Sequence, residues 1–522
     1  MDAKKHLQKA IELDPNYADA YYELGLLFKK DNESKKALEH FQKAVNLRED
    51  FAEAQCELAI MFMLENDLES SRNHFLNSLD IDPNYAKSYF QYGLLLIKLE
   101  DIEEAKNNFD KVTEIDQNFA QAYFNKAKLL TNPDDFEDAK KNYETALDID
   151  EEYLEANYYL AKLHYGGKAT DKEGTLIDRK SLEEAEKHFQ KVLEIDPKHH
   201  KSFYNLARIF VEKNKNKDAE AFLKKALDLS PEYSKAHFLF AHVLESSNKK
   251  KEAKKHYELS IDFFNQNQPA HYRLGVMLYG EGNEESALSH FKTSIEINAN
   301  HAESHYYTAM IMRSDEDASL AKKHFYKALE INPEYAQAYF ELGNHTVNHG
   351  DFNEAKLHFQ KATDLDQNFV MAYFHLGKIL TNPSEYSQAY RNYETALEID
   401  PQLADCHYWF AKLLSKGEKL KSDGSIILEP ELDKARHHLL RALEIDDKFA
   451  KAYYKLGLLQ VKHEEYSSSL ENFEKAINCN PKYAEAHYQI ALLLMDENAQ
   501  KEITANRRKR TKTPKPRATS AS

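Results

Sequence analysis

The sequence NYADAYYELGLLF occupies residues 16–28 and returns, with variations, at a spacing of 34 residues. The next copies are FAEAQCELAIMF at 51–62, NYAKSYFQYGLLL at 84–96 and NFAQAYFNKAKLL at 118–130. An alanine marks the same place in these copies, beginning at Ala18, and the period continues to Ala484. Numbered from this alanine, the chain divides into thirteen complete repeats with half a repeat at each end. A fixed period of this length is typical of a repeat architecture.

Small and aromatic side chains recur at fixed positions of the repeat. Position 8, counted from that alanine, is always Gly or Ala, and position 20 is Ala in eleven of the thirteen complete repeats. Position 24 is Phe or Tyr in eleven, with Leu223 and Leu439 as the exceptions, and position 27 is Ala, Ser or Val. Apolar residues at positions 4, 7, 8 and 11, and again at 20, 24 and 27, predict two amphipathic helices. Each repeat is expected to be a helical hairpin that closes at its small residues, with the ring filling the remaining space.

This combination of period and positions resembles the tetratricopeptide repeat, and the resemblance covers roughly residues 1–495. Pro at position 32 of six repeats agrees with it, because proline cannot continue a helix and would end the second one. The sequence departs from the family pattern at Gln55, Asn157 and several histidines in position 4, and at Lys126 and Thr308 in position 7. The resemblance implies an all-α fold, an α-α superhelix in which stacked hairpins form a solenoid with a concave groove.

A longer repeat is superimposed on the short one. AYFNKAKLLTNP at 122–133 returns as AYFHLGKILTNP at 372–383, an offset of 250 residues. Two insertions of 12 residues, near 166–177 and 416–427, keep the same offset. We infer that a block of seven repeats was duplicated together with its insertion.

The composition favours a soluble protein in a reducing compartment. Gly and Pro supply 14 and 13 of 522 residues, about half of their usual share, which argues against turn-rich and disordered classes. No run of about 20 apolar residues could cross a bilayer, and no signal region opens the chain. The three cysteines lie far apart and form neither a disulfide framework nor a zinc motif. We therefore predict a cytoplasmic protein with no cofactor and no structural metal.

The ends and the tail differ from the repeats. The chain begins inside a second helix, and no second stripe follows the first helix that starts at Ala484. Solenoids cover their terminal apolar faces, so either the ends pair with another chain, which includes self-association, or the sequence is part of a longer reading frame. We expect a solenoid over 1–495 and a disordered basic tail over 496–522, which has seven Lys and Arg and no acid from Ala505 onward. Because the whole chain carries a charge of −17, nucleic acid or an anionic membrane is expected to bind only through this tail.

The family resemblance implies that the first helix of each repeat lines the groove, with positions 2, 5, 6, 9, 12 and 13 toward the ligand. Position 5 is aromatic in every repeat except at Cys56, and rigid rings suit a peptide-binding surface. The alternative is that these rings pack on the neighbouring helix. Asn at position 6 resembles the asparagine ladder of the O-linked N-acetylglucosamine transferase arm, and the only tryptophan is a candidate anchor. The predicted groove residues are Phe124, Asn125, Lys128, Tyr158, Lys162, Tyr204, Asn205, Arg208, Phe238, His242, Phe374, Lys378, Tyr408, Trp409 and Lys412.

Signals of catalysis are absent from the sequence: it has no Gly-rich phosphate loop, no HExxH motif and no nucleophile elbow. His345 with His349, and His301 with His305, lack a further metal ligand at matching spacing. The sequence therefore predicts a non-enzymatic scaffold that binds protein or extended peptide ligands in the groove. Two alternatives stay open: a substrate-recognition arm of a larger enzyme such as a glycosyltransferase, and an RNA- or membrane-associated adaptor that acts through the tail.

Overall fold

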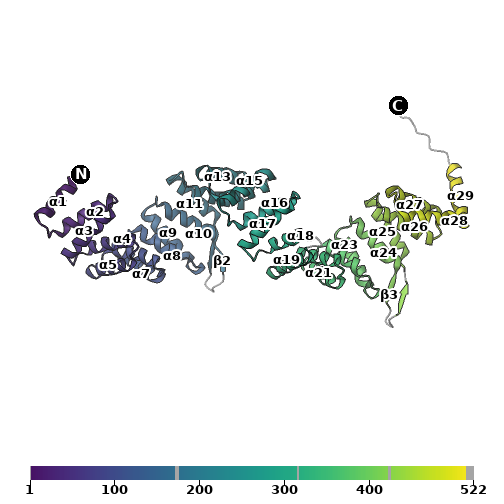
Figure 1. Ribbon diagram of the computed structural model, residues 1–522, viewed down its shortest axis with the longest axis horizontal. Helices are drawn as coiled ribbons and strands as arrows, with labels where there is room; N and C mark the ends of the chain where they lie inside the picture. The colour runs from purple at the N-terminus through teal and green to yellow at the C-terminus, as the bar shows by residue number, and fades with distance from the viewer. Residues whose placement is uncertain (1, 171–175, 314–316, 421–424, 429, 513–522) are drawn as a thin grey trace, which may run out of the picture. The chain divides into compact units, whose positions relative to one another are not determined.

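The computed structural model describes residues 2–170, 176–313, 317–420, 425–428 and 430–512. Helices are joined in consecutive antiparallel pairs (Figure 1). The chain falls into two compact units, residues 1–265 and 266–522. Thirteen hairpins are present in the described residues, from α2/α3 to α26/α27. The predicted all-α repeat fold is therefore confirmed.

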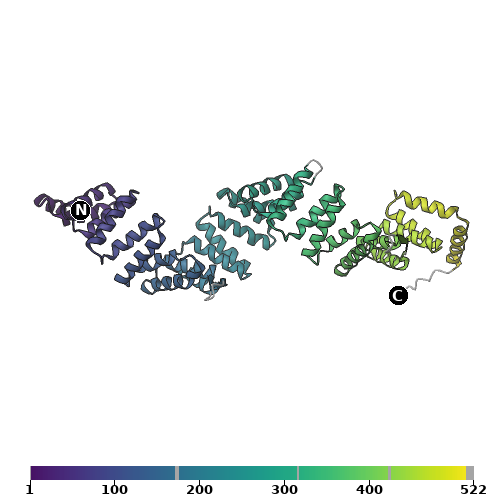
Figure 2. The same cartoon turned by 90° about the horizontal axis from the view of Figure 1, so that it is seen from below.

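Unit 1 contains seven complete hairpins, and within it each second helix packs on the first helix of the next hairpin (Figure 2). Its elements are α1 (Asp2–Leu13), α2 (Ala18–Lys30), α3 (Ser34–Leu47), α4 (Ala52–Leu64), α5 (Leu68–Ile81), α6 (Ala86–Lys98), α7 (Ile102–Ile115), α8 (Ala120–Leu129), the 3₁₀ turn η1 (Pro133–Asp135), α9 (Phe136–Ile149), α10 (Leu154–Gly166), β1 (Lys168–Thr170), β2 (Leu176–Asp178), α11 (Leu182–Ile195), α12 (His200–Glu212), α13 (Asn216–Leu229), α14 (Ser234–Ser246) and α15 (Lys250–Phe263).

Unit 2 contains six complete hairpins followed by two further helices. Its elements are α16 (Gln268–Gly280), α17 (Glu284–Ile297), α18 (Ala302–Ile311), α19 (Ala318–Ile331), α20 (Ala336–Asn348), α21 (Phe352–Leu365), α22 (Val370–Ile379), η2 (Pro383–Glu385), α23 (Tyr386–Ile399), α24 (Ala404–Lys416), β3 (Glu418–Leu420), β4 (Ile426–Leu428), α25 (Leu432–Ile445), α26 (Ala450–Lys462), α27 (Tyr466–Cys479), α28 (Ala484–Met495) and α29 (Glu497–Lys512).

Each hairpin closes at the small residue of position 8. A Cβ atom on Gly343 would lie 2.7 Å from Cε1 of Phe359, the ring at position 24 of the same hairpin. A Cβ on Gly25 would approach Phe41 to the same distance. Both rings are fully buried. The predicted pairing of a small residue with a ring is confirmed, and at these positions the ring occupies the space that a side chain would need.

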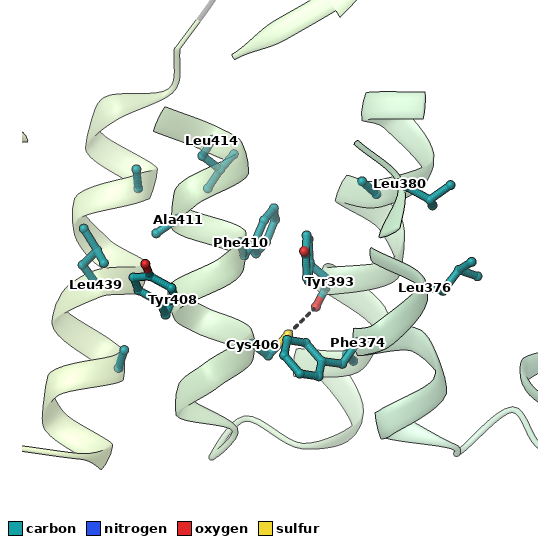
Figure 3. Packing of buried hydrophobic residues seen from close by; sticks show 14 of the residues in the cluster. Phe374, Leu376, Leu380, Tyr393, Cys406, Tyr408, Phe410, Ala411, Leu414 and Leu439 are labelled. Atoms are coloured by element: carbon teal, nitrogen blue, oxygen red, sulfur yellow. Dashed lines mark hydrogen bonds between the residues drawn. The ribbon is translucent and has the colours of Figure 1, made fainter. Parts of the chain in front are cut away.

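Neighbouring hairpins share one core. In unit 2, Phe374 of α22, Tyr393 of α23 and Phe410 of α24 belong to a single buried cluster (Figure 3). The rings of Tyr393 and Phe410 have their centroids 5.6 Å apart. The thiol of Cys406 donates a hydrogen bond to the carbonyl of Tyr393, with the sulfur 3.7 Å from the oxygen. α24 therefore holds α23 as well as its own hairpin partner α25.

Two devices turn the chain. Within most hairpins a residue at position 15 has a left-handed conformation, such as Gly350 with φ 81° or Asn32 with φ 60°. Between hairpins an Asp or Asn side chain accepts a hydrogen bond from the backbone N–H two residues on, as Asp82 does from Asn84 at 2.9 Å. The second helices end at position 30 whether or not proline follows, since α9 ends at Ile149 without one. Proline therefore accompanies this end and does not determine it.

Each 12-residue insertion carries a short antiparallel β-hairpin. β1 pairs with β2 so that Lys168 lies opposite Asp178, and β3 pairs with β4 so that Glu418 lies opposite Leu428. The two registers are the same at the 250-residue offset, which the duplication predicts. Parts of both insertions, residues 171–175 and 421–424, lie outside the described residues.

The prediction of a disordered tail from residue 496 is wrong for residues 497–512, because these residues form the helix α29. Ala499 and Ile503 are buried one turn apart in this helix and pack with Phe473 of α27. The carboxylate of Glu502 accepts hydrogen bonds from the backbone N–H groups of Tyr466 and Ser467, at 3.0 and 3.1 Å. Two apolar residues are too few to indicate an amphipathic helix from sequence. The remainder of the tail, residues 513–522, lies outside the described residues.

Candidate peptide-binding groove

The predicted groove residues all lie on first helices of hairpins. In unit 1 they occupy α8, α10, α12 and α14, and in unit 2 they occupy α22 and α24. They therefore form two groups, one within each unit.

The aromatic residues of position 5 pack between hairpins. The ring of Phe124 lies 6.0 Å from that of Tyr143 in its own hairpin and 5.1 Å from that of Tyr153 at the start of the next one. Tyr204 contacts Tyr233 at 5.2 Å, and Tyr408 contacts Phe449 at the same distance. Phe124, Phe374 and Tyr408 are buried, whereas Tyr158, Tyr204 and Phe238 are partly buried. The row holds the stack together, and its buried members offer little surface to a ligand.

The cations of position 9 lie over tyrosine rings in unit 1. Lys128 Nζ is 5.5 Å and Lys162 Nζ is 5.1 Å from the ring centroid of Tyr159. The Arg208 guanidinium is 4.3 Å from the centroid of Tyr165. These distances are within the range of cation–π attraction. We call these five residues the unit 1 face. The residue pattern did not indicate Tyr159 and Tyr165, which occupy positions 6 and 12, although a tyrosine at each position was visible in the sequence.

The two predicted asparagine rungs are engaged with their own helices. The side-chain amide of Asn125 donates to the carbonyl of Gln121 at 2.8 Å, and that of Asn205 donates to the carbonyl of Lys201 at 2.8 Å. Asn205 is also buried, and its amide oxygen accepts a hydrogen bond from Arg208 at 3.3 Å. Each amide therefore already commits an N–H group to the backbone of its own helix. His242 is exposed on α14.

In unit 2 the tryptophan lies between two lysines. Lys378 Nζ of α22 is 5.2 Å from the ring of Trp409, and Lys412 Nζ of α24 is 4.3 Å from it. Trp409 is partly buried and meets Tyr408 edge to face, with centroids 5.9 Å apart. We call Lys378, Trp409 and Lys412 the unit 2 face. It repeats the lysine-over-ring arrangement of unit 1 with an indole in place of a phenol.

The phenols near the unit 1 face stay protonated at neutral pH. Burial raises the pKa of Tyr158 and of Tyr204. Burial and a hydrogen bond from the hydroxyl of Tyr165 to Glu212 raise the pKa of Tyr165 to about 12. These hydroxyl groups can therefore donate hydrogen bonds but supply no negative charge to balance the nearby cations.

Family models match one long stretch of the chain and three single repeats. The model described as tetratricopeptide repeat protein 21 second ARM domain matches residues 2–248. The model described as tetratricopeptide repeat matches residues 336–369, 372–403 and 450–483. The chain belongs to the tetratricopeptide repeat family. This membership supports a role as a protein-interaction scaffold. No curated protein matches the chain in sequence.

Three solved structures are similar to parts or most of this tetratricopeptide repeat protein. YrrB, described as a TPR protein with an unusual peptide-binding site, is 24% identical over 36% of this chain and 97% of its own, with a TM-score of 0.33. The APC/C hetero-tetramer Cut9–Hcn1 is 15% identical over 91% of this chain and 96% of its own, with a TM-score of 0.40. Yeast Tom70 is 16% identical over 95% of this chain and 99% of its own, with a TM-score of 0.32. At these values the likenesses do not indicate what this chain binds.

Histidine pairs join the two helices of several tetratricopeptide hairpins. His237 of α14 and His256 of α15 place their Nδ1 atoms 2.9 Å apart, and His305 with His324 repeats this at 2.9 Å. The Nε2–H of His237 donates to the carbonyl of Pro231, at 2.9 Å, so its Nδ1 is the acceptor for the Nδ1–H of His256. The ring of His237 is therefore neutral, and burial lowers the pKa of both histidines.

Within the described residues, neither a metal centre nor a membrane span is indicated. His, Cys, Asp and Glu side chains nowhere gather in threes as a metal ion would need. None of the described helices combines the length and apolar composition that a bilayer span requires. His345 and His349 lie with ring centroids 4.4 Å apart, and His349 Nδ1 contacts the carbonyl of His345 at 2.8 Å.

Proposed function

We propose that the chain is a non-enzymatic scaffold that binds protein or extended peptide segments along the first helices of its hairpins. In unit 1 the binding surface would be centred on α8, α10 and α12, and in unit 2 on α22 and α24. The proposed ligand carries acidic side chains, together with apolar groups that can lie beside the rings.

The observation that carries this proposal is a set of cations that form no ion pair in the described part of the chain. Lys128, Lys162 and Arg208 in unit 1, and Lys378 and Lys412 in unit 2, form no ion pair within 4 Å among the described residues. The chain has 87 acidic and 70 basic residues, and many lysines elsewhere are paired, as Lys29 is with Glu57 at 2.6 Å. A row of unpaired cations over aromatic rings in so acidic a protein is suited to acidic partners, which long-range attraction would also guide to the groove.

Charge reversal in the unit 1 face tests the proposal. A peptide selected from a random library with the full chain is labelled, and its affinity is measured by fluorescence anisotropy. Lys162→Glu combined with Arg208→Glu is expected to weaken binding at least tenfold, because both changes replace attraction by repulsion. The same affinity should fall with added salt.

The matched control is Lys141→Glu combined with Lys198→Glu, two exposed lysines outside the first-helix face. This variant has the same net charge and should bind within twofold of the unchanged protein. Equal weakening of both variants, or no weakening of the first, would reject the unit 1 face as the binding site.

A further inference from the structure

A small cavity lies in unit 2 between α24, α25 and α26. Its volume is about 80 Å³. By liquid volume this holds roughly two to three water molecules, which suits one small chemical group and no ring system. The cavity is lined by Ala411, Lys412, Ser415, Leu439, Lys455, Leu458, Leu459 and Lys462.

The cavity exists where the repeat departs from its own pattern. Leu439 occupies position 24, which holds an aromatic ring in eleven hairpins. Position 8 of the same hairpin is Ala411, so neither side of this contact carries a large group. A leucine at position 24 leaves space that the usual ring would fill.

Three of the described lysines line this cavity and none of the described acids does. Lys412, Lys455 and Lys462 form no ion pair within 4 Å among the described residues. Burial, and the charges of the other two lysines, lower the pKa of Lys455. Two acids close by in sequence are committed elsewhere, since Glu418 pairs with Lys416 at 2.6 Å and Glu465 pairs with Arg436 at 2.8 Å. The three ammonium groups therefore repel one another, and an anion bound from outside the chain would reduce this repulsion.

The duplicated block supplies an internal comparison. At the 250-residue offset, Phe189 stands in place of Leu439 and Glu212 stands in place of Lys462. Phe189 is fully buried, and Glu212 forms an ion pair with Lys180. The unit 1 copy thus has a ring where unit 2 has the leucine, and an acid where unit 2 has a third lysine. Both differences favour an anion in unit 2 alone.

We propose that the cavity binds the phosphate group of a phosphorylated serine or threonine in the peptide that lies along the unit 2 face. This inference rests on the proposed groove function, because Lys412 belongs to both the cavity and the unit 2 face. A phosphate monoester carries about −1.5 to −2 charges at pH 7, so it offsets about half to two-thirds of the charge of three ammonium groups, whereas a carboxylate offsets only one charge. Lysine binds phosphate as a point charge and needs no bidentate geometry.

Site-resolved lysine acylation of the full chain tests the anion site, with inorganic phosphate as the probe. Rates are measured by mass spectrometry at constant ionic strength. We expect 10 mM phosphate to slow acylation at least threefold at Lys412, Lys455 and Lys462, and to leave Lys162 unchanged. Acetate at the same ionic strength should protect none of them. Absence of protection by phosphate, or equal protection by acetate, would overturn the proposal.

Two variants examine the cavity itself. Leu439→Phe introduces the residue type that most hairpins have at this position and should abolish phosphate protection of Lys412 by filling the space. Lys462→Gln, at the exposed end of α26, should reduce the protection without a packing change. Leu223→Phe, at the other leucine of position 24, is the matched control and should leave protection intact. Unchanged protection in both Leu439→Phe and Lys462→Gln would contradict the assignment.

A short peptide separates this inference from the groove function. A phosphoserine peptide flanked by acidic and aromatic residues should protect Lys412 at a concentration at least tenfold below that of inorganic phosphate. Lys378→Glu should remove this advantage while leaving protection by inorganic phosphate unchanged. Equal potency of the two probes would reject the phosphopeptide and the unit 2 face but retain an anion site. Tight binding of the unphosphorylated peptide, with no effect of Lys462→Gln, would retain the groove and reject the phosphate site.

Discussion

At the scale of single residues, the packing of several hairpins depends on glycine having no side chain at position 8. The hydrogen of Gly343 lets α20 approach the ring of Phe359, and the same arrangement recurs at Gly25 with Phe41. Other hairpins have alanine at this position, so their helices accommodate one methyl group. In the glycine hairpins the ring already fills the space of that methyl group, so the ring would have to move to accommodate an alanine.

We therefore expect Gly343→Ala to destabilise its hairpin by about 1–2 kcal/mol, since overpacking of a filled core has a cost of this order. Hydrogen–deuterium exchange should show faster exchange in α20 and α21. Gly280→Ala is the control, because a Cβ there meets nothing within 4 Å. An equal effect of the two substitutions would contradict the role of the ring contact.

The candidate site was only partly predictable from single residues. The position of Lys128, Lys162 and Arg208 on one helix face followed from the period, because residues with the same repeat number share an environment. The packing of the position 5 rings on the next hairpin did not follow from the period. Periodicity cannot distinguish a ring that packs on the next hairpin from one that faces a ligand. Lys455 and Lys462 were not predicted, because the cavity arises where Leu439 replaces the larger aromatic ring of other hairpins. A cavity of this kind has no sequence motif.

At the scale of the helix pair, the histidine pairs make the hairpins sensitive to acid. Burial, followed by the charge of the partner ring, lowers the pKa of His256, His324 and His438 to about 4. Well above pH 6.5 neither the folded nor the unfolded chain binds these protons to a significant extent. Between pH 6.5 and about 4 the unfolded chain takes up protons that the folded pairs do not, so the free energy of unfolding falls.

We expect the combined variant His256→Asn, His324→Asn and His438→Asn to lose less stability between pH 7 and pH 5 than the unchanged chain. Asn108 is an example of Asn at this position in another hairpin. The difference should be roughly 1 kcal/mol per pair, because solvent near these half-buried rings reduces the full effect of the shift. Urea titrations at the two pH values measure it.

The control replaces three exposed histidines, His6, His242 and His463, by asparagine. This variant should keep the acid sensitivity of the unchanged chain. If it loses the sensitivity as well, the effect belongs to net charge and the pairs are not responsible.

The last helix makes a second prediction at this scale. Glu502 of α29 accepts two backbone N–H groups at the start of α27, which otherwise lacks a side-chain cap. Glu502→Ala should cost about 1 kcal/mol, as the loss of a helix cap usually does. Amide exchange at Tyr466 and Ser467 should accelerate, whereas the exposed Lys501→Ala should have no effect. Unchanged exchange in Glu502→Ala would show that the cap is not needed.

At the scale of the whole molecule, the organisation is local, because in a repeat protein each hairpin packs on its sequence neighbours. The buried clusters around Phe41 and Phe109 lie within residues 1–265, and those around Phe325 and Phe359 lie within 266–522. Because of this locality, the pattern of a single repeat was enough to predict the fold. The same pattern could not predict the α29 helix. α29 has no copy elsewhere in the chain to define its pattern.

The chain should therefore tolerate division between its units. Fragments 1–265 and 266–522, made separately, are expected to show far-UV circular dichroism that adds up to that of the intact chain. Division after residue 247 separates α14 from α15 and is the control, since it breaks a hairpin and should reduce the summed helical signal. A large loss of helix in the first pair of fragments would show that the units do not fold alone.

The β-hairpins of the insertions have a practical consequence for engineering. Thr170 lies opposite Leu176 across the strands, and the backbone N–H of Ser181 donates to the carbonyl of His164 at 3.0 Å. The entry and exit of the inserted segment are thus fastened together before α11 begins. A fluorophore, an epitope or an entire foreign domain could be grafted beyond the strands of either copy, giving two equivalent handles for imaging or tethering.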